Sequence, residues 1–169
     1  MDVLLEFFRH NSMMNRTLLD TCRGLTPGQL ASTTEGTYGS IAATLVHIAN
    51  AQAGYAARLL NVERPTRLPE DPFPGFPVLA ERLSIGDGQL EEATGRNDWD
   101  RQVQITGDDP PGTWLMPVGL FLLQAINHGT EHRSQIATIL SQLGIEPPAM
   151  DGWGYILETD YLIEVEPQR

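Results

Sequence analysis

The chain has 169 residues, a formal net charge of −11 and 41% hydrophobic residues, values typical of a single soluble globular domain over residues 1–169. All 11 of its lysine-plus-arginine residues are arginines, which excludes Schiff-base and lysine-nucleophile mechanisms. Because such an acidic surface repels phosphate backbones, we expect no nucleic-acid partner. No stretch is long and apolar enough to span a membrane, and the N-terminus lacks the pattern of a signal peptide. We therefore expect a cytoplasmic protein, with its one cysteine, Cys22, as a small buried hydrophobe.

The first part of the chain has the pattern of helices separated by short joints. Apolar residues with a period of about 3.6 predict a first helix from about Val3 to Cys22. The stretch "LTPGQL" offers Thr26 as an N-cap and Pro27 at the first helical position, which indicates a short helical turn. A second long helix is predicted from its cap at Ser40 to about Val62.

A proline-rich segment, residues 63–77, divides the chain, and its prolines exclude a helix or a central strand. We expect it to be an ordered surface crossing or a mobile flap, which leaves open whether it covers a site. A third helix is predicted from about Pro77 to Arg96. Residues 100–116 alternate apolar and polar side chains around "DDPPG", which favours a short hairpin or an extended excursion. Pro117 can open a fourth long helix that ends near Leu143, with Gly144 as its C-cap.

The acidic C-terminal tail contains apolar and aromatic residues that we expect to pack on the helices: Trp153, Tyr155, Ile156, Leu157, Tyr161 and Leu162. Four long amphipathic segments joined by loops predict an all-α fold, a four-helix bundle with a short hairpin before its last long helix.

Two of the four histidines, His128 and His132, are one helical turn apart in the fourth helix. A helical projection puts His132 inside the apolar stripe and His128 at its edge, with Cβ atoms about 5–6 Å apart. This spacing suits two ligands of one metal ion, and it is equally compatible with two core histidines. Glu131 is not placed as the catalytic glutamate of an HExxH motif would be, and we expect it to be solvated.

His47, in the second long helix, is a candidate third ligand. It lies off the aliphatic line of that helix and is flanked by Ala43 and Ala51, with Gly54 beyond. Such small residues leave room for a ring and its ligand, or alternatively let another helix approach closely. If the histidine faces meet, three imidazoles surround one point. We interpret His10, the fourth histidine, as a solvated or capping residue.

Arg133 projects toward an apolar flank of the fourth helix. A guanidinium in such a place needs a carboxylate or carbonyl partner, and Asp151 or Glu158 in the tail could supply it. Alternatively, its stem extends along the apolar surface and the charge reaches solvent.

These residues resemble the DinB/YfiT-like family of helical-bundle metalloproteins. The resemblance lies in "LVHIANAQ" around His47, in "HGTEHR" from His128 to Arg133, and in the aromatic stretch "DGWGYI". It implies a four-helix bundle in which His47, His128 and His132 bind one divalent metal ion, commonly zinc or nickel. It also implies that some members use a low-molecular-weight thiol such as mycothiol or bacillithiol as co-substrate, and that homodimers are common.

Three imidazoles leave an open position on the metal, as in catalytic zinc sites. Such a site suits thiol-dependent S-transfer of a small-molecule substrate, or hydrolysis by a metal-activated water. No carboxylate lies on the histidine faces, and Asn50 and Gln135 can orient a ligand without acting as acid or base. One alternative is a non-enzymatic bundle whose metal is structural or sensory. The other is a metal-free interaction module that uses the aromatic tail and Trp114.

Overall fold

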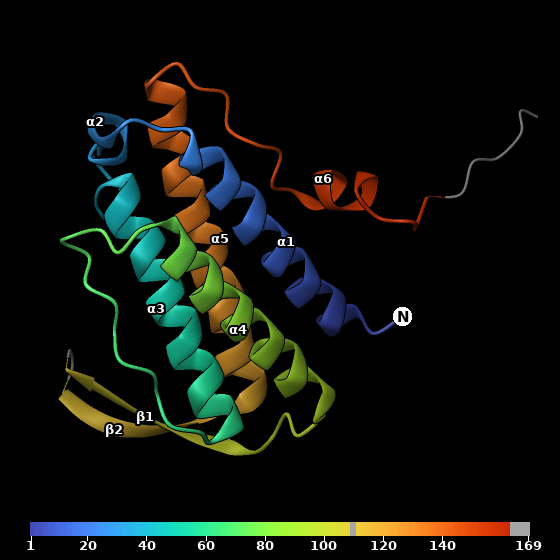
Figure 1. Cartoon of the computed structure of the whole chain (residues 1–169). Coiled ribbons are helices and arrows are strands. Elements are labelled where there is room, and N and C mark those ends of the chain that lie inside the picture. The colour runs from blue at the N-terminus through green and yellow to red at the C-terminus, as the bar shows by residue number, and fades with distance from the viewer. Residues whose placement is uncertain (109–110, 163–169) are drawn as a thin grey trace, which may run out of the picture.

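Four long helices form the body of the computed structural model, which describes residues 1–108 and 111–162 (Figure 1). They are α1 (Val3–Arg23), α3 (Ile41–Leu60), α4 (Phe76–Gly95) and α5 (Val118–Gln142). The shorter elements in the described ranges are α2 (Pro27–Leu30), α6 (Gly152–Leu157) and the strands β1 (Gln102–Asp108) and β2 (Pro111–Pro117). The predicted all-α four-helix bundle with a short hairpin before the last long helix is confirmed.

The order of the helices in space explains the proline-rich crossing. Helices α3 and α4 run in the same direction, and α1 and α5 run in the opposite one (Figure 1). Two consecutive parallel helices require a connection as long as the bundle, and residues 61–75 supply it along the side of α3. This segment is an ordered crossing, because the backbone of Leu68 and the carbonyl of Thr66 are hydrogen-bonded to Asn50 and Arg82 of the helices.

The predicted helix caps form where the sequence offers them. The Thr26 side chain accepts a hydrogen bond from the Gln29 N–H, and the Gln29 side chain caps Thr26 in return. The Ser40 hydroxyl accepts from the Ala43 N–H at 3.2 Å, so α3 begins at Ile41. Polar side chains thus satisfy N–H groups that have no partner within their own helix.

The other ends differ from prediction by one or two residues. Helix α1 continues to Arg23, and α4 runs from Phe76 to Gly95 with Arg96 as its C-cap. Helix α3 ends at Leu60 because Asn61 takes the left-handed conformation, with φ of 57°. Leu143 is the C-cap of α5, and Gly144, which was predicted there, follows it with φ of 73°.

The predicted hairpin precedes α5. Strands β1 and β2 are antiparallel, with Val103 opposite Met116 and Ile105 opposite Trp114. Residues 109 and 110, in the predicted turn, lie outside the described residues. Pro117 is the N-cap of α5, so the hairpin leads directly into the helix that carries two of the candidate ligands.

The core consists of two groups of buried side chains along the bundle. One lies around Leu45, Leu79 and Ile136, and it includes Cys22, which is fully buried as predicted. The other lies around Leu59, near the hairpin. Between them, α3 and α5 face each other at the level of the histidines. Among the described residues, no helix is both long enough and apolar enough to cross a membrane.

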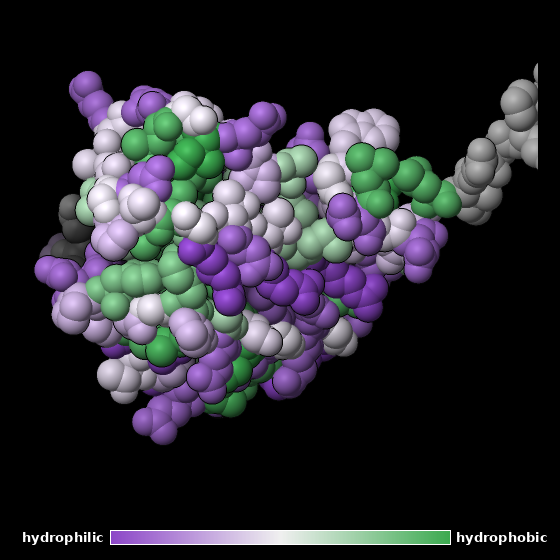
Figure 2. All heavy atoms as spheres, turned by 45° about the horizontal axis from the view of Figure 1, so that its top comes forward, coloured by the Kyte–Doolittle hydropathy of each residue, from purple (hydrophilic) through white to green (hydrophobic). Residues whose placement is uncertain are grey.

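The tail packs on the bundle less closely than predicted. The Tyr155 hydroxyl donates a 2.7 Å hydrogen bond to Glu6 of α1, and α6 stands at the side of α1 (Figure 1). Trp153 and Leu157 are 72% and 71% exposed, so the expectation that they are packed is wrong. Helix α6 turns the Tyr155 side toward α1, and its apolar outer side chains lie at the surface, where Figure 2 shows green spheres at the tail end of the molecule.

Candidate metal centre

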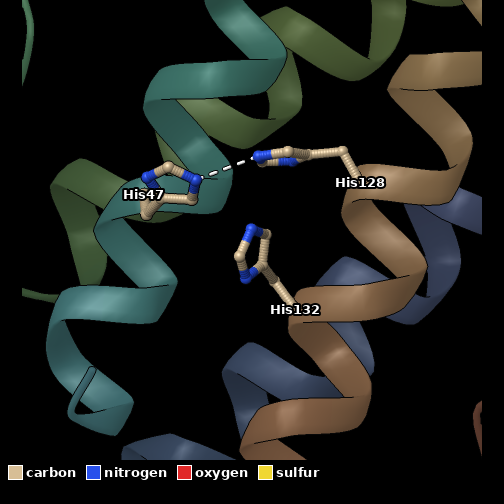
Figure 3. Close-up of side chains that lie close together, drawn as sticks. All are labelled: His47, His128 and His132. Carbon is tan, nitrogen blue, oxygen red and sulfur yellow. Dashed lines mark hydrogen bonds between the residues drawn. The ribbon is translucent and has the colours of Figure 1, made fainter. Parts of the chain in front are cut away.

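Three histidine rings converge between α3 and α5 (Figure 3). His47 comes from α3, and His128 and His132 come from successive turns of α5. The Nε2 atoms of His47 and His128 are 2.9 Å apart, and one ligand nitrogen from each of the three rings lies within 4.8 Å of the others. The spacing of His128 and His132 and the small-residue face around His47 therefore do bring three imidazoles to one point.

Burial lowers the proton affinity of two of the rings, His47 and His128. His132 is 8% exposed, and the other two are half-buried. Burial, followed by the neighbouring His132 and His47, lowers the pKa of His128 to about 4. Burial and the charge of His132 also lower the pKa of His47. Both rings are therefore neutral at neutral pH, which is the form that binds metal ions.

Gln135 fixes the orientation of His132. Its Oε1 lies 2.9 Å from Nδ1 of His132, and the same oxygen accepts a 3.1 Å hydrogen bond from the Tyr38 backbone N–H. Because an amide oxygen only accepts, Nδ1 of His132 carries the proton. Nε2 of His132 is then left with a free lone pair, which is the arrangement found around metal-binding imidazoles.

Two tyrosines, which the sequence patterns did not single out, enclose the centre. The Tyr38 ring lies 4.0 Å from that of His47 and meets His132 edge-on at 5.4 Å, measured between centroids. Tyr55 meets His128 edge-on at 5.6 Å. Tyr38 comes from the loop before α3, which has no periodicity to mark its path, whereas Tyr55 belongs to α3 itself and follows His47 by eight residues.

The proline-rich crossing brings a carboxylate near the centre. The Tyr38 hydroxyl donates a 2.9 Å hydrogen bond to Glu70, whose charge acts on His47 together with the opposing charge of Arg67. Asn50 does not orient a ligand, because it exchanges two hydrogen bonds of 2.9 and 2.8 Å with the backbone of Leu68. Its role is to hold the crossing beside the histidines.

The nitrogen positions fit a metal ion. A zinc ion bound tetrahedrally at about 2.0–2.1 Å holds its nitrogen ligands about 3.4 Å apart. The observed spacing, from 2.9 Å for one pair up to 4.8 Å, brackets this value. A metal would replace the hydrogen bond between His47 and His128, since it needs both Nε2 lone pairs. The donor set is therefore compatible with one divalent ion bound by three neutral imidazoles.

Comparison with known proteins identifies the family of the chain. The model of the DinB family matches residues 1–165, nearly the whole chain. The chain belongs to the DinB family. No curated protein matches the sequence. A crystal structure of a DinB-like protein from Bacillus cereus ATCC 10987 is similar over 88% of this chain and 96% of that one, with a TM-score of 0.67 and 19% identity. At so low an identity the likeness supports the DinB fold alone.

Arg133, which ends the DinB-like "HGTEHR" stretch, has carbonyl partners of the predicted kind, but they do not come from the tail. It is 3% exposed, so its charge does not reach solvent. Its Nη1 donates hydrogen bonds of 2.7 and 2.8 Å to Asn11 and Asn15 of α1, not to Asp151 or Glu158. The tail is held elsewhere by Tyr155, whereas two amide oxygens of α1 lie directly opposite α5.

The remaining candidates lie outside the centre. His10 lies 3.2 Å from the carbonyl oxygen of Met150 and meets Tyr155 edge-on, so it joins α1 to the tail. Glu131 is exposed, as predicted, and does not face the rings. In the described part of the chain, the group of potential ligands therefore consists of His47, His128 and His132.

Proposed function

We propose that this DinB-family protein is a metalloenzyme in which His47, His128 and His132 bind one divalent metal ion, zinc or nickel. The observation that carries the proposal is the convergence of three imidazoles with no fourth side-chain ligand in the described residues. Structural zinc sites normally use four protein ligands, whereas catalytic sites use three and leave one position for substrate. Three neutral ligands also leave the ion its full charge.

Such an ion supplies Lewis acidity, which favours the deprotonated form of a water or of a thiol. The chain itself supplies the surroundings. Gln135 holds His132 in one tautomer, and the rings of Tyr38 and Tyr55 exclude water from two sides. Glu70 lies behind Tyr38, with its carboxylate already accepting from the phenol.

Of the two reactions that suit this site, thiol-dependent S-transfer is the better supported. Hydrolysis by a metal-activated water is helped by a base that takes up its proton, and the Glu70 carboxylate described above already accepts a hydrogen bond from Tyr38. A thiolate is itself the nucleophile and needs no such base. We therefore propose a low-molecular-weight thiol as co-substrate, with hydrolysis of a small molecule as the second candidate.

The test is elemental analysis of protein purified without a metal-binding tag, beside His47→Ala, His128→Ala and His132→Ala. We expect close to one zinc or nickel ion per chain in the unmodified protein and loss of metal in each variant. Full metal content in all three variants would contradict the proposal.

Chelation distinguishes the proposed catalytic metal from a structural or sensory one. If the metal serves the fold, its removal lowers the melting temperature strongly, because its binding free energy is then folding free energy. The two core groups lie above and below the histidines and do not depend on a metal to meet. We therefore expect the chelated protein to stay folded while thiol-transfer activity is lost.

A further inference from the structure

A polar hollow lies at the hairpin end of the bundle, away from the histidines. It has a volume of about 630 Å³ and lies where the end of α3, the end of α4 and the start of β1 meet. Four arginines line it, Arg58, Arg64, Arg96 and Arg101, with Asp98 as the one acidic residue among the lining residues. This is an excess of positive charge in a chain whose net charge is −11.

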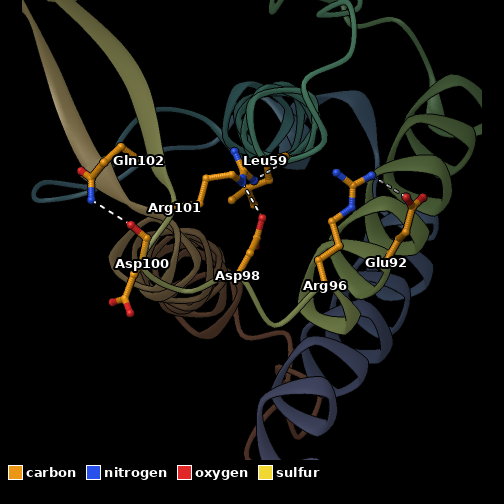
Figure 4. A network of polar contacts seen from close by, with 7 residues as sticks. All are labelled: Leu59, Glu92, Arg96, Asp98, Asp100, Arg101 and Gln102. Atoms are coloured by element: carbon orange, nitrogen blue, oxygen red, sulfur yellow. Dashed lines mark hydrogen bonds and ion pairs between the residues drawn. The ribbon is translucent and has the colours of Figure 1, made fainter.

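The single carboxylate is not available to neutralise the hollow. Arg101 Nε donates to Oδ2 of Asp98, and Arg101 Nη2 donates a 2.6 Å hydrogen bond to the Leu59 carbonyl (Figure 4). Oδ1 of Asp98 is buried without a hydrogen-bond partner in the described structure. Arg101 and Asp98 therefore form a structural pair that attaches the hairpin to the end of α3.

Arg96 makes only a surface pair with Glu92, one helical turn before it (Figure 4). Their side chains are 41% and 60% exposed, and an ion pair so exposed contributes little free energy. The guanidinium of Arg96 can therefore exchange this partner for a ligand at small cost.

Arg58 and Arg64 have no carboxylate partner among the described residues. Arg58 donates one 3.2 Å hydrogen bond to the Gly54 carbonyl of its own helix. The Arg64 guanidinium lies against Gly54, where an added Cβ would be 3.1 Å from Nη2. Burial, then the charges of Arg58 and Arg67, disfavour the charged form of Arg64 and lower its pKa. Two like charges thus line the same hollow, and neither is neutralised by a carboxylate of the described residues.

We propose that Arg58 and Arg64, assisted by Arg96, form a binding subsite for an oxyanion group, a carboxylate or a phosphate, of a small-molecule ligand. Guanidinium groups bind both anions through paired N–H donors. An anion here would relieve the repulsion between the arginines, and the hollow has room for it.

The position of the subsite links it to the histidines. Gly54 and Arg58 follow His47 by seven and eleven residues on α3, which corresponds to about 10 and 16 Å along the helix. Seven residues make about two turns, so Gly54 lies on the His47 face. One extended ligand that spans both sites is the second step of the proposal. In this step, the substrate of the metal centre carries a negative group about 10–16 Å from its reacting end. The step rests on the proposed function.

The test is calorimetric titration with inorganic phosphate, and separately with succinate, at low ionic strength. All proteins carry His128→Ala and His132→Ala, so that no metal at the histidines binds the probe. The variant is Arg58→Gln/Arg64→Gln. The control, Arg16→Gln/Arg23→Gln, removes the same charge from exposed positions of α1. Because Arg64 lies outside the helices, the single variant Arg64→Gln is the one whose folding is least affected.

We expect the parent protein and the control to bind at least one of the two anions, with affinity at least about tenfold weaker in the Arg58 and Arg64 variants. The tighter of phosphate and succinate identifies the group recognised. Absence of binding by the parent, or equal loss in the control, would overturn the subsite. Because the histidines are replaced throughout, failure of the metal proposal does not affect this result.

Discussion

Oε1 of Gln135 lies 2.9 Å from Nδ1 of His132, one helical turn away on α5. The same oxygen accepts from the backbone of Tyr38, so the amide cannot turn over without losing a hydrogen bond. This one side chain therefore sets both the tautomer of a candidate ligand and the position of the loop whose aromatic ring covers the site.

We predict that Gln135→Ala weakens zinc binding about 10- to 100-fold, because His132 then loses the acceptor that orients it. Gln135→Glu should retain most of the affinity, since a carboxylate accepts the same hydrogen bond. Competition with a chromophoric chelator measures both. The matched control is Gln142→Ala, at an exposed position of the same helix. Equal affinities for Gln135→Ala and the control would show that the contact does not support the ligand.

The three histidines that converge could be identified from the sequence because the information that marks each of them is local. Spacing by one turn places His128 and His132 on one face whatever surrounds them, and the small residues beside His47 mark a face that can be approached. Helix number and caps follow from the same short-range rules, which is why the predicted ends differ by at most two residues.

What could not be predicted depends on contacts between distant segments. Arg133 meets Asn11 and Asn15 across the bundle, 122 and 118 residues away in sequence. Glu70 reaches the site only because the crossing runs back along α3, and Tyr38 belongs to a loop without periodicity. Polar residues on an otherwise apolar face, such as Asn11, were the available sign that a buried polar network lay opposite.

That network yields a stability prediction at Gly129. An added Cβ would lie 2.8 Å from Oδ1 of Asn11 and 2.9 Å from Nη1 of Arg133, which are hydrogen-bonded to each other. Since Asn11 is also held by Gln52, it cannot move aside freely. We expect Gly129→Ala to lower the free energy of unfolding by about 1–3 kcal/mol in urea titrations.

Gly88→Ala in α4 is the control for helix propensity. Nothing lies within 4 Å of its added Cβ, so we expect a gain of about 0.5–1 kcal/mol in the free energy of unfolding. Two glycine-to-alanine changes within long helices should thus have opposite signs. A gain at both positions would mean that the network around Arg133 yields easily.

Cys22 reports on opening of the core. It is fully buried in α1, and burial raises the pKa of its thiol to about 12. The thiolate that reacts with iodoacetamide is therefore both scarce and inaccessible in the folded protein. We expect no measurable labelling at mildly alkaline pH in buffer and complete labelling in concentrated urea, followed by mass spectrometry.

The control for this measurement is Cys22→Ala/Ser141→Cys, which moves the thiol to an exposed position on α5. It should react rapidly in buffer. Labelling of Cys22 in buffer at the rate of that control would mean that α1 separates from the core much more often than its burial indicates.

After removal of the metal, the free energy of unfolding should depend on pH because of the histidines. The pKa of His128 is about 4 in the folded chain against an ordinary 6.5, so between these values the unfolded chain binds more protons than the folded one. The free energy of unfolding of the chelated protein therefore falls as pH falls from 6.5 toward 4. His47 acts in the same direction, because its pKa is also lowered.

The carboxylates of the chain titrate in part of the same range, so the informative quantity is a difference between two proteins. His128→Gln removes a buried ring that resists protonation, and we expect its melting temperature to fall less steeply with acid than that of the chelated parent. Thermal unfolding of both, with chelator present throughout, measures the two slopes. Parallel slopes would show that His128 takes up its proton in the folded chain as easily as in the unfolded one, and that the space between α3 and α5 is open to water.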